Sequence, residues 1–343
     1  MRIALDATYS VGSHLSGVGV YSRRILDGLA TQHAEANYVW CYRPHRLARS
    51  YSIVVPRHVS RRPLFDSWTP QAGLFHGLNQ RLPAKPHGRT VSTFHDLFVM
   101  TADYSTPEFR ARFAAQARDA ATRSDLIIAV SRFTALQVEE LLSIPAARIR
   151  VVPHGVALRE PGPPQSERAK TILTVGAMQK RKNTARLVEA FERTPPGWKL
   201  VLAGGTGFES DRIQRRIAES PRARDIVQPG YVSADELNRL YAEASIFAFP
   251  SLDEGFGIPV LEAMASGAAV LTSHHGALRE VAGDAALLVD PQEVSSIAEG
   301  LSTLMEVQTL REQLAAVGYE RARRFTWESA VEQTWKVYQE LLN

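Results

Sequence analysis

The stretch SIFAFPSLDEGFGIPVLEAMASG, residues 245–267, has the order of a buried strand, a glycine-containing loop and a helix. Its apolar beginning predicts a strand in a parallel sheet that is covered on both faces. Gly255 and Gly257 let the loop backbone come close to a ligand, and Pro259 suits the first position of a helix, where no N–H is needed. Because ligands of such sheets collect beyond the carboxyl ends of the strands, this loop is a candidate site.

The same alternation of short apolar runs and helical periodicity extends through the chain. In the first half it predicts strands at 2–6, 38–42, 52–55, 73–77, 90–94, 125–130 and 149–153, with helices at 18–31, 107–122 and 132–142. In the second half it predicts strands at 171–177, 198–205, 225–230, 245–251, 268–273 and 285–290. This pattern is typical of an α/β protein with two doubly wound, Rossmann-like domains, which we expect to face each other across a cleft.

The stretch 154–170 interrupts the pattern, because it is rich in proline and charge and has no periodicity. We therefore expect a first domain at 1–156, a linker at 157–169 and a second domain at 170–325. The remaining residues, 326–343, predict a helix with Thr326 as its N-cap, and we expect this helix to pack back toward the first domain.

Composition limits the protein class. Of the 343 residues, 45% are hydrophobic and 22% are charged, which is typical of a globular protein with a large core. The sequence contains no apolar run of roughly 18–20 residues that would span a bilayer, and its beginning does not resemble a secretory signal. A single cysteine, Cys41, indicates a reducing compartment. We expect a cytoplasmic protein, with peripheral contact at the inner face of the membrane as a weaker expectation.

Charge is unevenly distributed along the chain. The net charge is +8 in residues 1–155 and −4 in residues 156–343, which together give the +4 of the whole chain. Much of the basic excess lies in 41–63 and in 105–125. These segments are compatible with a solvated arginine-rich surface or with an anionic partner, such as a membrane surface or a phosphorylated acceptor. No nucleic-acid-binding motif accompanies the charge, so we expect no nucleic-acid partner.

Two glutamates flank the bend in the opening stretch. Backbone N–H groups at 260–262 are expected to lack a local acceptor, because Ile258 has no side chain that can cap the helix, and they favour an anion. Glu262 in the first helical turn is suited to a ribose diol, and Glu254 in the loop to a second sugar. Taken singly, Glu262 is explained by stabilisation of the helix dipole and Glu254 by an ordinary solvated loop. Their spacing together with the glycines is more specific than either residue.

The segment EGFGIPVLEAMASG (254–267) resembles the signature of retaining nucleotide-sugar glycosyltransferases of the GT-B fold, glycosyltransferase family 4. That motif is Glu, seven residues, Glu. Other segments appear in the order found in the family: SGVGVYSRRIL (16–26), TFHDL (93–97), AVSRFT (129–134), VVPHGV (151–156), VGAMQKRKN (175–183), LAGG (202–205), GYVS (230–233) and EVAGDAALLVDP (280–291). The chain is most similar to the bacterial O-antigen and exopolysaccharide mannosyltransferase branch.

The resemblance implies a role for each matching residue. Glu254 would bind hydroxyls of the transferred sugar, Glu262 the nucleotide ribose, and the cations after the strand at 171–177 the diphosphate. The implied catalytic residues are His95, Arg181, Lys182 and Glu254. The implied donor-binding residues are Gly17, Gly19, Gly176, Gly204, Tyr231, Gly255, Phe256, Gly257, Ile258 and Glu262, and the implied acceptor-side residues are Asp96, Ser131 and His154.

Some of these residues have ordinary structural explanations. Taken without the family, KRK (180–182) is most often a solvated run, and a His–Asp pair at a strand end, as at His95, is more often structural. Many relatives carry an arginine where this chain has Ala177, so Arg181 must contribute more to binding the phosphates.

The chemistry implied by the resemblance needs no metal. No D-x-D pair occurs among the 13 aspartates, and no histidine or cysteine spacing matches a metal site. We therefore expect no cofactor, with Arg181, Lys182 and helix N-termini stabilising the departing diphosphate. Retention in this family is attributed to same-face attack, which makes Glu254 a sugar binder and not a nucleophile.

We predict transfer of a hexose, foremost mannose from GDP-mannose, to a glycan or lipid-linked acceptor in cell-surface polysaccharide synthesis. A UDP-sugar donor is an alternative within the class, because the two glutamates contact groups that both donors share. A nucleotide-dependent oxidoreductase is disfavoured: SGVG (16–19) continues as G-x-G-x-x-S, with no acidic residue about 20 positions later at a strand end. A two-domain sugar-binding protein is disfavoured by the basic loop at 180–182 and by the lack of an export signal.

Overall fold

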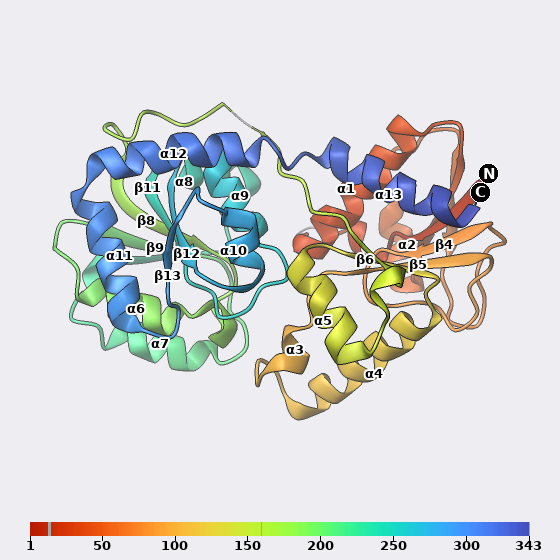
Figure 1. Ribbon diagram of the computed structural model, residues 1–343, viewed down its shortest axis with the longest axis horizontal. Helices are drawn as coiled ribbons and strands as arrows, with labels where there is room; N and C mark the ends of the chain where they lie inside the picture. Colours follow the sequence, from red (N-terminus) through yellow and green to blue (C-terminus); the bar gives the residue numbers. More distant parts are fainter. Residues whose placement is uncertain (13–14, 159, 343) are drawn as a thin grey trace. The chain divides into compact units, whose positions relative to one another are not determined.

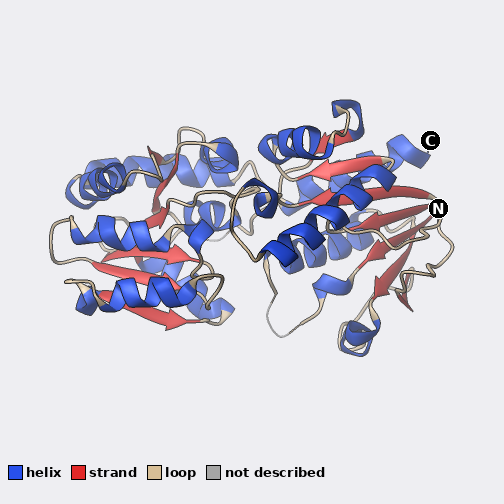
Figure 2. Ribbon diagram, turned by 90° about the horizontal axis from the view of Figure 1, so that it is seen from below, coloured by secondary structure: helices blue, strands red, loops and turns tan. Residues whose placement is uncertain are grey.

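The chain forms two compact units in a computed structural model that describes residues 1–12, 15–158 and 160–342. The first unit comprises Met1–Gly155 and Trp327–Asn343, and the second comprises Val156–Thr326. Each unit has its own parallel sheet, and Figure 2 shows the strands of each sheet lying between helices. The predicted α/β architecture of two doubly wound parallel sheets is confirmed.

The sheet of the first unit has seven parallel strands in the order β3-β2-β1-β4-β5-β6-β7. The strands are β1 Arg2–Asp6, β2 Asn37–Tyr42, β3 Val59–Pro63, β4 Leu74–Gly77, β5 Arg89–Phe94, β6 Leu126–Ala129 and β7 Ile149–Val151. One prediction is wrong: residues 52–55 form no strand, and the edge strand is β3. Val54 is 95% exposed, whereas β3 pairs with β2 through its backbone although most of its residues are polar or proline.

Helices cover both faces of this sheet (Figure 1). One core cluster joins α1 (Gly17–Gln32) and α13 (Trp327–Leu342) to one face, and another joins α4 (Pro107–Arg123) and α5 (Arg132–Leu142) to the other. Two shorter helices are α2 (Pro44–Ser50) and α3 (Phe98–Thr101). The approach of α1 to α13 depends on Gly28, because a Cβ there would lie 2.3 Å from a methyl group of Val331.

The sheet of the second unit has six parallel strands in the order β10-β9-β8-β11-β12-β13. The strands are β8 Ala169–Val175, β9 Lys199–Ala203, β10 Ile226–Gly230, β11 Ala244–Phe249, β12 Ala269–Ser273 and β13 Leu287–Val289. Because β8 pairs directly with β11, the loops that follow these two strands emerge side by side at the carboxyl edge.

The helices of the second unit again lie on both faces of their sheet. One core cluster packs α6 (Thr184–Glu192), α7 (Ser210–Ala218) and α11 (Val294–Glu306) against the strands. The other helices are α8 (Ala234–Glu243), α9 (Ile258–Ala265), α10 (Gly276–Ala282) and α12 (Gln308–Ala322), and α12 packs on α9. No helix in the described ranges is both long and apolar enough to cross a membrane.

The segment expected to be a linker, 157–169, is part of the second unit, and its Arg159 lies outside the described residues. Gln165 and Arg168 are buried. The guanidinium of Arg168 donates to the carbonyls of Ala244 and Ser266, and the Gln165 amide donates to the carbonyl of Gly267 at 2.8 Å. The bonds to Ser266 and Gly267 satisfy carbonyls at the end of α9, so the segment supports the helix that follows the candidate loop.

Candidate active site

The loop between β11 and α9 begins the site. Gly257 is the N-cap of α9 with a φ of 115°, a conformation that favours glycine, and the helix begins at Ile258. Pro259 therefore occupies the second helical position and not the first. The N–H groups of Val260 and Leu261 donate to the Gly257 carbonyl, so they do not lack an acceptor as expected. Within the described residues it is the N–H groups of Gly257 and Ile258 that donate to no acceptor, one turn earlier.

Two cations lie beside this loop. They come from the short turn Lys180–Lys182 between β8 and α6, which is followed by Asn183 in the left-handed region at φ 60°. The Asn183 amide donates to the carbonyls of Pro250 and Pro291 and so fixes the turn against the end of β11. The structure brings the predicted cations Arg181 and Lys182 together with Glu254, and Arg181 is only 8% exposed.

The carboxylate of Glu254 lies between the two cations. Its Oε2 is 2.7 Å from a guanidinium nitrogen of Arg181, and its Oε1 is 2.6 Å from Lys182 Nζ. Ser251 donates a third bond of 2.7 Å to Oε1. Burial would raise the pKa of Glu254, but the charges of Arg181 and Lys182 and the bonds from Lys182 and Ser251 lower that pKa to about 2. The carboxylate therefore stays ionised at neutral pH.

The rest of the protein holds these cations in place. Arg181 donates to the carbonyl of Asp253 at 2.7 Å, and Lys182 Nζ lies 4.5 Å from the ring centroid of Phe249 at the end of β11. Two positive groups face one negative group, so the cluster carries one excess positive charge. Such a cluster can attract a further anion.

Glu262 is the fifth residue of α9, beyond the first turn that the sequence predicts for it, and is half-buried. Tyr241 of α8, itself 1% exposed, donates a 3.0 Å hydrogen bond from its hydroxyl to Glu262 Oε2. This bond orients the carboxylate. Sequence reasoning missed Tyr241 because its position on an amphipathic helix looks like an ordinary core position.

Two predicted glycines follow the neighbouring strands β8 and β9. A Cβ on Gly204 would lie 2.0 Å from the carbonyl oxygen of Gly176, so Gly204 is required for the close packing of two loops. A Cβ on Gly176 would lie 3.4 Å from Lys182 Cε, which places Gly176 beside the cation cluster. Tyr231, after β10, is 60% exposed.

The predicted residues of the first unit form a different kind of cluster. His95 follows β5 and His154 follows β7, and their rings stack with centroids 5.3 Å apart. His95 Nε2 donates to the Leu78 carbonyl at 3.0 Å, which leaves Nδ1 of the neutral ring to accept from His154 Nε2 at 3.4 Å. Tyr21 packs edge-on against both rings. Burial lowers the pKa of His95 to about 4, so this ring is neutral at pH 7.

A buried polar chain continues from Tyr21. Its hydroxyl is 2.9 Å from Thr93 Oγ1, which is 2.8 Å from His76 Nε2, and His76 Nδ1 is 2.6 Å from the hydroxyl of Tyr338 on α13. Burial also lowers the pKa of His76, to about 3. The chain connects the terminal helix with the histidine cluster. Sequence reasoning did not find it, because no spacing links residues on four separate elements.

The remaining predicted residues of the first unit have local roles. Ser131 is the buried N-cap of α5 and accepts from the N–H of Thr134. Gly17 begins α1, and a Cβ on Gly19 would lie 2.8 Å from the Tyr9 carbonyl oxygen. Asp96 follows His95 in the loop after β5.

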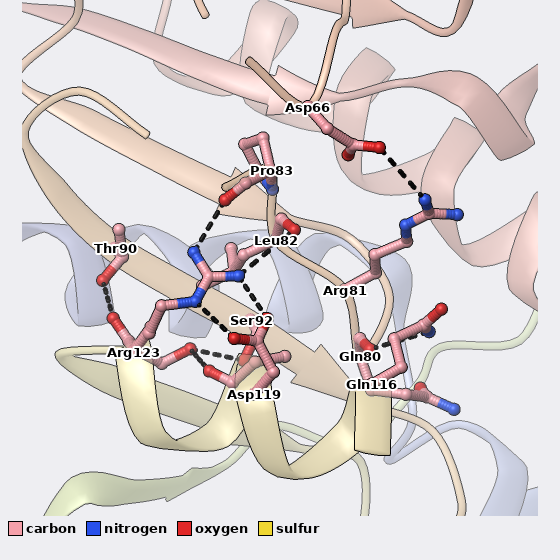
Figure 3. Close-up of polar contacts among 12 residues, drawn as sticks. Asp66, Gln80, Arg81, Leu82, Pro83, Thr90, Ser92, Gln116, Asp119 and Arg123 are labelled. Carbon is pink, nitrogen blue, oxygen red and sulfur yellow. Dashed lines mark hydrogen bonds and ion pairs between the residues drawn. The ribbon is translucent and has the colours of Figure 1, made fainter. Parts of the chain in front are cut away.

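Two of the four arginines of the basic segment 105–125 form ion pairs within the first unit. Figure 3 shows Arg123 of α4 reaching the carbonyls of Leu82 and Pro83 while it pairs with Asp119 on its own helix. Arg110 pairs with an aspartate in the preceding loop. Arg112 and Arg118 are exposed and form no ion pair in the described ranges, so their charge remains available to an external anion.

Two protein families match the chain, one mainly in each unit. The family described as Glycosyltransferase Family 4 matches residues 64–160, and the family described as Glycosyl transferases group 1 matches residues 160–321. The chain is 32% identical over 281 residues to O-antigen chain mannosyltransferase B of Escherichia coli, covering 77% of this chain and 74% of that protein.

Solved structures share the fold over nearly the whole chain. Sucrose-phosphate synthase from Thermosynechococcus elongatus is 21% identical with a TM-score of 0.81, and each chain covers 99% of the other. Anabaena HepE in complex with UDP and glucose is 16% identical with a TM-score of 0.77 and covers 99% of this chain and 100% of its own. The chain therefore belongs to the group 1 glycosyltransferases of family 4 and has their GT-B fold.

Proposed function

We propose that the chain is a retaining hexosyltransferase that moves mannose from GDP-mannose to a glycan or lipid-linked acceptor in cell-surface polysaccharide synthesis. The name of the Escherichia coli relative supports the sugar and the pathway class. The observation that carries the proposal is the pairing of Glu254 with both Arg181 and Lys182 beside the start of α9.

The cations and the helix start bind the donor diphosphate in this proposal. Arg181 and Lys182 are held in place before any ligand arrives, and the N–H groups of Gly257 and Ile258 add two donors at a helix N-terminus. Preorganised donors of this kind stabilise charge that develops on a leaving group without reorganisation during the reaction.

The two carboxylates orient the sugar and the ribose. Glu254, ionised and fixed by three partners, accepts hydrogen bonds from hydroxyls of the transferred hexose. Glu262 accepts hydrogen bonds from the ribose diol. The bond from the anomeric carbon to the β-phosphate oxygen breaks, and the acceptor oxygen bonds to that carbon from the same face. The acceptor proton passes to the departing phosphate oxygen. On the acceptor side, Nδ1 of neutral His95 exchanges its 3.4 Å bond from His154 for a hydrogen bond from an acceptor hydroxyl.

We propose that the reaction proceeds without a metal ion, because two protein cations occupy the position where the diphosphate would be neutralised. Full activity in excess EDTA is the expected result. Activity that disappears with EDTA and returns with added magnesium or manganese would contradict metal independence while leaving the donor site in place.

A thermal-shift screen of nucleotide sugars tests the donor. A ligand that binds only the folded state raises the melting temperature of the protein. Because GDP-mannose is the proposed donor, we expect it to raise the melting temperature more than UDP-sugars do. A larger shift with a UDP-sugar would support the alternative donor, for which the HepE complex is a precedent in this fold. Stabilisation by NAD would instead support an oxidoreductase. NMR of the glycosidic product then tests retention of the anomeric configuration.

We further propose a cytoplasmic protein that contacts anionic membrane through the basic first unit. In this unit Tyr51 is 67% exposed and Val54 is 95% exposed. The guanidinium of Arg61 lies over the Tyr51 ring, so a basic and an aromatic group lie together there. Sedimentation with liposomes should increase with anionic lipid and decrease with salt. Sedimentation that changes with neither the anionic lipid content nor the salt concentration would contradict the membrane contact.

A further inference from the structure

A second basic site lies at the amino ends of strands in the first unit, whereas His95 follows the carboxyl end of β5. A pocket of about 520 Å³ opens at the amino ends of β1, β2 and β3, and its lining includes Arg2, Asn37, Arg57, Ser60 and Arg62. Ligands of doubly wound domains bind at carboxyl ends, so the fold alone does not account for this pocket.

Strand register places several of these residues on one face. Arg2 is directly opposite Asn37, and Arg62 is opposite Cys41, which has the same side-chain parity as Asn37. Ser60 lies two residues before Arg62 and therefore faces the same way. Arg57 joins them from the loop before β3.

The three arginines of the pocket have no carboxylate partner in the described ranges, and Arg62 donates one hydrogen bond, to the carbonyl of Arg61 at 2.8 Å. Arg2, Arg57 and Arg62 are exposed, form no ion pair with any residue in the described ranges, and no aspartate or glutamate lines the pocket. By contrast, Arg43, which follows the carboxyl end of β2, pairs with Asp66. Charges on an edge strand protect it from pairing with other chains, which would explain Arg62. That explanation fails for Arg2, because β1 lies inside the sheet, and for Arg57 in a loop.

We propose that this pocket binds a phosphate or diphosphate group, separately from the sugar donor. Guanidinium groups bind phosphate oxygens in pairs of hydrogen bonds, and the Asn37 amide supplies a neutral donor. The volume falls within the range of small-ligand sites, which runs from about 300 to 1,000 Å³. The group comes either from a soluble phosphorylated ligand or from a lipid headgroup.

Calorimetric titration with inorganic pyrophosphate tests the site on the full chain. The donor site is first filled with saturating GDP-mannose, so that binding at Arg181 and Lys182 is not measured. Its diphosphate is esterified at both ends and has no free terminal phosphate to compete for the pocket. We expect one further site whose affinity falls at least about tenfold in the double variant Arg57→Glu, Arg62→Glu, because three arginines would become one arginine and two carboxylates. The matched control, Arg24→Glu with Arg118→Glu, reverses two exposed arginines elsewhere in the same unit and should change affinity less than about twofold.

A second variant removes the concern that charge reversal disturbs folding. Arg57→Lys with Arg62→Lys keeps the charge but loses paired hydrogen bonding, so we expect intermediate affinity. Absence of a second site in the unaltered protein would overturn the proposal. Equal losses in the pocket and control variants would also overturn it, because they would show a response to net charge alone.

Vesicles identify the source of the phosphate. We compare phosphatidylcholine vesicles with and without phosphatidic acid, using the same variants. Binding that needs phosphatidic acid and is lost only in the pocket variants assigns the site to a lipid headgroup. Pocket-dependent binding of pyrophosphate without pocket-dependent binding of vesicles assigns it to a soluble ligand. If neither depends on Arg57 and Arg62, the proposal is wrong.

Discussion

Two buried polar clusters follow parallel strands in this molecule, and they handle charge in opposite ways. In the second unit Glu254 stays ionised because Arg181 and Lys182 lie within 2.7 Å. In the first unit burial lowers the pKa of His76 and His95 to about 3 and about 4, so the rings are neutral. The comparison teaches that one cluster keeps its groups ionised by pairing opposite charges, whereas the other keeps its histidines neutral by burial.

Removing Glu254 should have the largest effect. In Glu254→Ala we expect transfer to fall by at least about 10²–10³-fold, as when a preorganised transition-state group is lost. Binding of nucleoside diphosphate should persist or strengthen, because both cations lose their competing carboxylate. Rates and calorimetric affinities measured on the same preparation check this.

Glu254→Gln is the matched control, because it keeps the shape and removes the charge. Parallel losses of transfer and nucleotide affinity in both variants would contradict the separate role given to Glu254.

Acid should destabilise the first unit before the second. Between pH 6.5 and about 4 the unfolded chain binds protons that buried His95 does not, so the free energy of unfolding decreases as pH falls through this window. The slope is about 1.4 kcal/mol per pH unit for each such histidine. Glu254, with its pKa lowered from 4.5 to about 2, adds a loss only below pH 4.5.

Hydrogen exchange at pH 7 and pH 5 measures this difference. Protection should fall at pH 5 in the strands of the first unit and remain in those of the second. His76→Gln should reduce the pH dependence of protection in the first unit. His275→Gln, at an exposed position, should leave that dependence unchanged. Equal loss of protection in both units would break the comparison.

A change at His95 should be the smallest of these effects on transfer. We expect His95→Asn to lower the rate about tenfold, the size of a lost neutral hydrogen bond, with nucleotide affinity unchanged. Steady-state kinetics at varied acceptor concentration should show that the loss lies on the acceptor side. A matching loss of nucleotide affinity would show that the first unit also holds the anion.

Local patterns allowed much of the fold to be predicted, since alternation of apolar runs and helical periods marks buried strands and their helices. The missed strand β3 shows the limit. Val59–Pro63 is an edge strand whose backbone pairing, and not apolar side chains, holds it, while the apolar residues at 52–55 lie outside the sheet. The C-terminal helix was predicted from its apolar residues, and its packing on α1 explains why they are apolar.

The sequence named Arg181, Lys182 and Glu254 as candidates but not the contacts between them. Lys182 and Glu254 lie 72 residues apart, and only the pairing of β8 with β11 brings their loops together. Ser251 and Tyr241, which orient the two glutamates, carry no motif of their own. Their roles depend on where a side chain points, which a one-dimensional pattern does not contain.

The central claim is that Arg181 and Lys182 bind the diphosphate, and one difference measurement tests it most directly. Affinities of a nucleoside diphosphate and the matching monophosphate are measured for the unaltered protein and for Lys182→Met. We predict that the diphosphate binds more tightly to the unaltered protein and that most of this advantage disappears in the variant, while monophosphate affinity changes little. An advantage that survives unchanged in Lys182→Met would contradict the account.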